Sequence, residues 1–216
     1  MKRYLKPLAI VASLAVTFVV GTAWSDDDDE REEEGAAATA AATEGMEEMM
    51  ARWMAAATPG ENHEYLARQV GKWNTRTRVW MEGPQSEPSE STGTAERRMI
   101  LGGRFLAEET DGAIAGMPHQ GFGLTGYDNF KQRFVANWVD NMTTGILAMS
   151  GTLDGGGKVL TCYGQMDEPM TGEHDKWVKY VHREVSDDEH VFEIYDLSQG
   201  DDAKTLEVTY TRAKEE

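Results

Sequence analysis

The side chains in this sequence that could do acid–base or metal chemistry are scattered and form no compact motif. None of the five histidines belongs to a His-Glu-x-x-His pair, and none lies at zinc-site spacing from the single cysteine, Cys162. The sequence also has no Gly-x-Ser-x-Gly nucleophile elbow and no phosphate-binding glycine loop. These patterns predict no metal site, no cofactor and no assignable catalytic residue.

His119 is the histidine best placed for recognition, because it lies in a Gly- and Pro-containing segment over residues 111–120. We expect this segment to be a mobile loop at the mouth of a binding site, since loops on a rigid scaffold often carry recognition. His119 would then contact a ligand. An alternative is that His119, His182 or His190 is an axial ligand of a haem.

Alternation with period two predicts which side chains share a face of a strand. Trp73, Thr75 and Thr77 share one face, and Trp138 and Asp140 share a face on another strand. If these faces point inward, aromatic, hydroxyl and carboxylate groups line a cavity that suits a small, partly apolar ligand. The predicted ligand-binding residues are Thr75, Thr77, His119, Tyr127, Trp138, Asp140 and Glu193.

The two carboxylates of this set allow other interpretations. Asp140 and Glu193 could be buried structural ions paired with Arg104 or Arg183, because pairing is the usual remedy for a buried charge. Asp140 could also form an acid–base pair with Tyr127 or His119, which would make the protein an enzyme of the isomerase or hydrolase type.

The elements that must position these side chains are strands. Alternating runs rich in β-branched and aromatic residues continue from Lys72 to Arg212 and are separated by turn residues. Residues 121–164 alone contain four such runs, with turns at Asp128-Asn129 and at residues 154–157. The pattern predicts an all-β fold with short N-terminal helices, an antiparallel up-and-down barrel of about nine or ten strands that leaves no open edge.

The first 45 residues do not read as part of that barrel. A basic start, an apolar run and the segment Ala23-Trp24-Ser25 predict a signal peptide over residues 1–25, and hence a periplasmic or extracellular protein. An uncleaved membrane anchor is the alternative. Residues 26–45 are acidic and then rich in Ala and Thr, which predicts a disordered tether.

Residues 46–70 are predicted to be helices that pack on the barrel domain of residues 71–216. The first helix has an apolar stripe at helical spacing, formed by Met46, Met49, Met50, Trp53 and Met54.

Charge and cysteine content restrict the partners. The formal net charge is −17, which makes nucleic acid and anionic membranes poor partners. One cysteine cannot form an internal disulfide, and Cys162 is predicted to be an inert buried residue. We therefore expect a small-molecule partner, no nucleic acid, and no stable membrane insertion after signal cleavage.

The sequence resembles two related groups of barrels. Gly71-Lys72-Trp73 at the start of the first strand and Arg212 on the last strand are similar to the Gly-x-Trp and late Arg of lipocalin-like (calycin) barrels. That resemblance implies that Arg212 stacks on Trp73 at the closed end of the barrel.

A second resemblance covers nearly the whole domain and is to the bacterial family known as domain of unknown function 1579. It implies a calycin-type barrel and no established activity, and Lys179 stands where that family is expected to have an arginine. The motifs that carry it are 57–63 (ATPGENH), 101–105 (LGGRF), 126–129 (GYDN), 138–140 (WVD), 167–172 (DEPMTG) and 190–193 (HVFE).

Overall fold

The structure is a computed structural model that describes residues 28–214, so the predicted signal peptide over residues 1–25 lies outside the described residues. The chain divides into two units between Met49 and Met50. Within the described range, no helix is both long enough and apolar enough to cross a membrane.

Helix α1 (Asp28–Ala57) occupies most of the segment for which the sequence predicted disorder. Its 30 residues are dominated by Ala and Glu, which are among the best helix formers, and contain no proline. The prediction over residues 26–45 gave weight to charge repulsion and too little to helix propensity.

The part of the apolar stripe that belongs to the barrel unit is largely exposed, whereas the sequence predicted that it packs on the barrel. Met50, Trp53 and Met54 belong to the same unit as the barrel, and their exposed fractions are 44%, 67% and 60%. Helix α2 (Glu61–Ala67) does pack on it, because Tyr65 and Leu66 are only 1% exposed and join the core.

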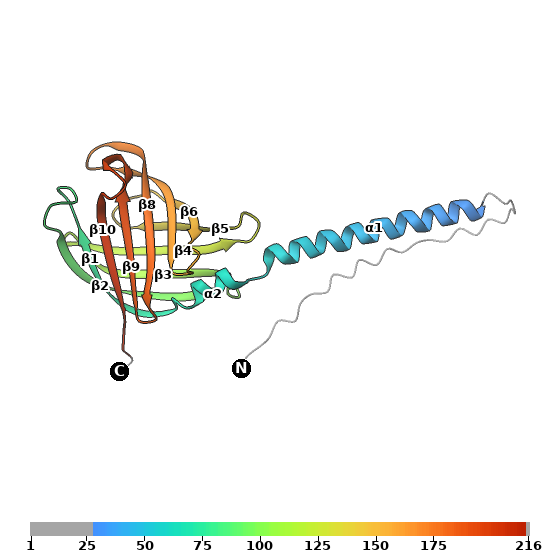
Figure 1. The fold of residues 1–216 in the computed structure, drawn as a ribbon, viewed down its shortest axis with the longest axis horizontal. Helices are drawn as coiled ribbons and strands as arrows, with labels where there is room; N and C mark the ends of the chain where they lie inside the picture. Colours follow the sequence, from blue (N-terminus) through green and yellow to red (C-terminus); the bar gives the residue numbers. More distant parts are fainter. Residues whose placement is uncertain (1–27, 215–216) are drawn as a thin grey trace. The chain divides into compact units, whose positions relative to one another are not determined.

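Ten antiparallel strands form a closed barrel, as the sequence predicted (Figure 1). Each strand pairs with its neighbours in sequence, and β1 pairs with β10 to close the sheet, so no edge is left open. The strands are β1 (Gly71–Val79), β2 (Ser89–Ile100), β3 (Phe105–Ile114), β4 (Met117–Asp128), β5 (Arg133–Asp140), β6 (Leu147–Leu153), β7 (Val159–Glu168), β8 (Glu173–Ser186), β9 (Glu189–Asp196) and β10 (Lys204–Arg212); a 3-10 turn, η1 (Leu197–Gln199), precedes β10.

Residues 111–120 do not form the predicted mobile loop. They are the paired ends of β3 and β4, joined by Ala115 and Gly116 with φ angles of +49° and +79°. Positive φ at both turn positions is typical of the tight two-residue hairpin. Gly112 allows β3 to approach β2 closely, because a Cβ at this position would lie 2.7 Å from the Cα of Gly93 on β2.

One end of the barrel is closed by α2 and by Trp73. Helix α2 lies against β2, β3 and β4 at that end (Figure 1). Trp73 is 1% exposed, and its indole nitrogen donates to the carbonyl oxygen of Gln69 at 3.1 Å. The Cζ atom of Arg212 lies 4.2 Å from the centroid of the Trp73 ring, so the guanidinium covers the ring and keeps its charge at the rim.

Candidate functional site

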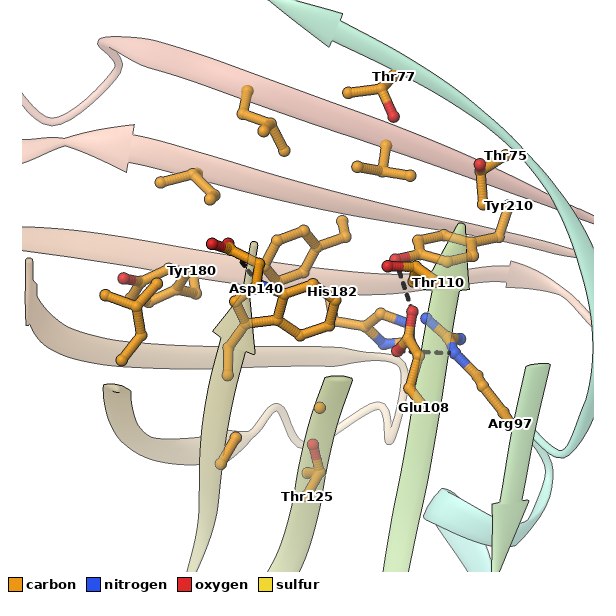
Figure 2. A pocket seen from close by; sticks show the side chains of 18 of the residues that line it. Thr75, Thr77, Arg97, Glu108, Thr110, Thr125, Asp140, Tyr180, His182 and Tyr210 are labelled. Carbon is orange, nitrogen blue, oxygen red and sulfur yellow. Dashed lines mark hydrogen bonds and ion pairs between the residues drawn. The ribbon is translucent and has the colours of Figure 1, made fainter. Parts of the chain in front are cut away.

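The barrel encloses a cavity of about 300 Å³. Alternation along each strand supplies its wall, because every second side chain points inward. Most of the surface of that wall is apolar, and polar side chains enter it from several strands (Figure 2). The apolar lining includes Leu106, Leu160, Ile194, Leu206 and Val208.

Arg97 and Glu108 form the polar group nearest the closed end. Arg97 is 3% exposed, and its Nε donates to Glu108 Oε2 at 3.1 Å. The Tyr210 hydroxyl donates to the other carboxylate oxygen of Glu108 at 2.9 Å, and the Arg97 guanidinium lies 4.1 Å from the Tyr210 ring centroid. Burial alone would lower the pKa of Arg97, but the Glu108 carboxylate raises it above its usual value. The two charges therefore compensate each other.

Strand β8 contributes a different kind of polar wall. His182 and Tyr180 lie on its inner face, and these two residues are 9% and 3% exposed. The Tyr65 hydroxyl of α2 lies 3.0 Å from His182 Nδ1. Within residues 28–214, neither His182 Nε2 nor the Tyr180 hydroxyl has a hydrogen-bond partner.

Both groups on β8 are uncharged at neutral pH. Burial, the positive charge of Arg97 and the neighbouring His190 hold the pKa of His182 well below its usual value. Burial raises the pKa of Tyr180 to about 12. The wall therefore presents a neutral imidazole and a protonated phenol.

The end of the cavity away from α2 is shaped by Trp138. Its indole lies over Gly121 and Gly123, and a Cβ on Gly123 would be 3.0 Å from the ring, so both glycines make room for it. The His119 ring is stacked on the same indole at 6.1 Å between centroids.

Asp140 anchors the loop that follows β5. It accepts hydrogen bonds from Trp138 Nε1 at 2.9 Å and from the backbone N–H groups of Met142 and Thr143 at 3.0 and 3.2 Å. His119 Nε2 is 3.8 Å from Asp140 Oδ2, beyond normal hydrogen-bond length. The carboxylate is thus occupied by local donors, and it does not pair with Arg104, which donates to the carbonyl oxygen of Leu101.

Five of the seven predicted ligand-binding residues line the cavity: Thr75, Thr77, His119, Trp138 and Asp140. Tyr127 does not, because it packs against Phe134 and His63 of α2 beneath the closed end. The predicted acid–base pair of Asp140 with Tyr127 is therefore not assembled.

Glu193 also lies away from the cavity. Its neighbours Phe192 and Ile194 line the wall, which turns Glu193 to the outer surface. There it accepts from Arg183 Nε at 2.9 Å and pairs with Lys204. Burial would raise the pKa of Glu193, but the bonds from Lys204 and Arg183 lower it overall. Glu193 is therefore a structural ion paired with Arg183, which was the alternative interpretation of this carboxylate.

Four polar lining residues are not among those predicted from the sequence: Arg97, Glu108, Tyr180 and His182. Arg97 and Glu108 face each other across the β2–β3 hairpin, and counting outward from its glycine turn would have paired them. Tyr180 and His182 alternate with Val181 on β8, a signal that could have placed both on one face.

Reactive groups are few in this site. Cys162 lines the cavity, and burial raises the pKa of its thiol to about 12, so it is not a thiolate at neutral pH. In the described part of the chain, no three His, Cys, Asp or Glu side chains converge to hold a metal ion.

Comparison with known proteins identifies a family. A sequence model described as "Protein of unknown function (DUF1579)" matches residues 58–212. No curated protein matches the chain. Among solved structures, Rv2717c from M. tuberculosis is 16% identical with a TM-score of 0.49, and covers 73% of this chain and 100% of its own.

Two further solved structures are similar. The S-type phycobiliprotein lyase CPES from Guillardia theta is 9% identical, covers 73% of this chain and 95% of its own, and has a TM-score of 0.49. A redesigned β-barrel, mFAP0, solved bound to DFHBI, is 14% identical, covers 67% and 99%, and has a TM-score of 0.37. The fold described for this chain is taken from its own strand pairing and not from these similarities.

Proposed function

This chain belongs to the DUF1579 family of proteins of unknown function, and we propose that it binds one small, partly apolar molecule inside the barrel. The observation that carries the proposal is the cavity of about 300 Å³, which lies within the size range of small-molecule sites. A small barrel without a ligand role is usually filled by its own side chains.

The composition of the wall supports the same function. Aliphatic side chains supply most of the surface, and the few polar groups could fix the orientation of a ligand. Trp138 and His119 lie at the end away from α2, where their stacked rings add a flat aromatic surface.

The enzyme alternative has less support from the geometry. A general base must have a free lone pair within reach of the proton it removes. Three of the roughly four lone-pair sites of the Asp140 carboxylate already accept hydrogen bonds, from Trp138, Met142 and Thr143. His119 is too far from it for a good hydrogen bond.

The haem alternative also fits the cavity poorly. Of the three histidines considered, His119 and His182 line the cavity and His190 does not. A volume of about 300 Å³ is at the lower end for ligand sites and small for a porphyrin macrocycle.

Titration with prodan, a small neutral fluorescent ketone, tests the proposal. We expect saturable uptake with a blue shift of prodan emission and a change in Trp138 fluorescence. Replacing Ala136, which lines the cavity, by Phe should block uptake because the new ring fills the space. Val139→Phe on the same strand is the matched control, because Val139 is 38% exposed on the outer face.

Two results would count against the proposal. One is the absence of prodan uptake by the folded wild-type protein. The other is equal uptake by the Ala136→Phe and Val139→Phe variants, which would place the probe on the outer surface.

We also propose that the protein is exported through residues 1–25, on the basis of the basic, apolar and small-residue pattern of that segment. N-terminal sequencing of the mature protein should then begin near Asp26. Recovery of an intact N-terminus in the membrane fraction would favour the anchor instead.

A further inference from the structure

We propose that the ligand is an uncharged molecule with a carbonyl-type oxygen, and that this oxygen accepts a hydrogen bond from Nε2–H of His182. The inference rests on the proposed function, because it names the chemical class that the same cavity selects. It makes His182 a residue that determines specificity.

The hydrogen bond from Tyr65 assigns the tautomer of His182. A neutral imidazole carries its proton on one nitrogen and accepts with the other. The Tyr65 hydroxyl is 3.0 Å from Nδ1, which is its one hydrogen-bond partner among the described residues, so only donation to Nδ1 leaves no buried O–H unpaired. Nδ1 is therefore the acceptor, and Nε2 carries the hydrogen. Helix α2 thus fixes the ring of His182, a residue of the cavity wall, with Nε2–H as its one donor.

Because that donor is buried, the site should prefer a ligand with an acceptor oxygen to a hydrocarbon. His182 is 9% exposed, and the described residues offer no acceptor to Nε2. A buried donor without a partner has lost its hydration without compensation. A ligand oxygen that reaches Nε2 recovers this loss, whereas a hydrocarbon of the same shape leaves the donor unpaired.

The charges around the cavity disfavour an anionic ligand. Arg97 is the buried cation of the wall, and it is already paired with Glu108 at 3.1 Å. Asp140 lines the other end, where the only basic partner within 4 Å among the described residues is the imidazole of His119. The chain as a whole carries a formal net charge of −17. A carboxylate would therefore enter a site with no free positive charge.

Tyr180 offers a second hydrogen-bonding group on the same face of β8. Its hydroxyl is buried and has no partner within the described range (Figure 2). Because a phenol both donates and accepts, it does not by itself select a ligand class. The selectivity is thus assigned to His182, which can only donate through Nε2.

Three naphthalenes of nearly equal shape separate the possibilities: 2-acetylnaphthalene, its methylene analogue 2-isopropenylnaphthalene, and 2-naphthoate. Binding of each is measured by equilibrium dialysis against the full chain. The wild-type protein should bind the ketone about tenfold more tightly than the hydrocarbon, the effect of one buried hydrogen bond. It should bind the carboxylate more weakly than the ketone.

The His182→Phe variant should lose the preference for the ketone while it still binds the hydrocarbon. His174→Phe is the matched control and should keep the preference, because the His174 side chain is 81% exposed. Nitrogen-15 NMR of the wild-type protein gives a second readout that needs no variant. The Nε2–H resonance of His182 should shift with the ketone and stay in place with the hydrocarbon.

Equal affinities for ketone and hydrocarbon, a preference that survives in His182→Phe, or tighter binding of the carboxylate would each overturn the inference. Those results would leave the proposed function intact, because the probes would still bind. The absence of binding by all three probes would instead count against the proposed function itself.

Discussion

The closed end of the barrel and the end with Trp138 are both built from aromatic and charged side chains, but their contacts span very different lengths of chain. At the closed end, Tyr210 bonds to Glu108 across 102 positions and Arg212 to the Val70 carbonyl across 142. At the other end, Asp140 bonds to Trp138 two positions away. The closed end therefore joins distant strands, whereas the Trp138 end orders one hairpin and its loop.

The two sets of contacts indicate which polar residues stabilise the whole fold. Long-range contacts close loops whose entropy must be offset before the barrel forms, so their loss affects the whole domain. Local contacts among β4, β5 and the following loop change the shape of one part of the cavity. Substitutions at the closed end should thus act on stability, and substitutions at the Trp138 end on binding.

The largest effect is expected at Trp73. Trp73→Ala removes a ring that is 1% exposed and covered by Arg212, so it should lower the free energy of unfolding by about 3–5 kcal/mol. Urea unfolding followed by circular dichroism measures this. Trp177→Ala is the control, since Trp177 is 55% exposed and should cost less than about 1 kcal/mol. Equal costs for the two variants would contradict the structural role given to the closed end.

A smaller effect, dependent on pH, is expected at His190. Its ring lies 4.7 Å from Trp73 and 5.2 Å from His182 between centroids. Burial and the positive charges of Arg97, Arg212 and Arg68 lower the pKa of His190 to about 4, against a small opposing effect of Asp187. In the unfolded chain the same imidazole takes up a proton near pH 6.5.

The direction of the pH effect on stability follows from which state, folded or unfolded, binds the proton. Between about pH 6.5 and pH 4 the unfolded state binds a proton that the folded state does not, so stability falls as the pH falls. Over that range, protonation of His190 in the unfolded chain lowers the free energy of unfolding by about 3 kcal/mol. Urea unfolding at several pH values should show a shallower acid dependence for His190→Phe than for the wild type. The exposed-site variant His174→Phe should keep the wild-type slope, and an unchanged slope in His190→Phe would refute the assignment.

Particular residues show how much could be read from the sequence. The turn residues and alternating runs predicted the barrel, because each hairpin is a local feature. Alternation also placed Trp138 and Asp140 on one face. The face of Glu193 was assigned wrongly, because alternation shows which residues share a face and does not say which face points inward. The apolar pair Phe192 and Ile194 on the opposite face of β9 lines the cavity.

The candidate site was harder to predict than the fold because its polarity depends on distant contacts. The role of His182 follows from Tyr65, which is 117 positions earlier in the chain. Neither residue has a local motif that indicates the pairing. At helix α1 the error was the opposite one. The helix propensity of this segment is a local signal in the sequence, but the prediction of disorder gave more weight to its acidic charge.

The smallest effect on stability is expected at Asp140, and it separates the two ends most directly. Asp128 and Asp140 each end a strand and each accept hydrogen bonds from the backbone N–H groups two and three positions later. Asn keeps one oxygen that can accept the two backbone bonds, so Asp128→Asn should cost less than about 1 kcal/mol. Asp140→Asn also loses the hydrogen bond from Trp138 Nε1 and should cost about 1–2 kcal/mol. Only Asp140 lines the cavity. Asp140→Asn should therefore strengthen binding of 2-naphthoate relative to 2-acetylnaphthalene in equilibrium dialysis, because it removes a negative charge from the wall. Asp128→Asn should leave that ratio unchanged, and the same ratio in both variants would show that the charge of Asp140 plays no part in ligand selection.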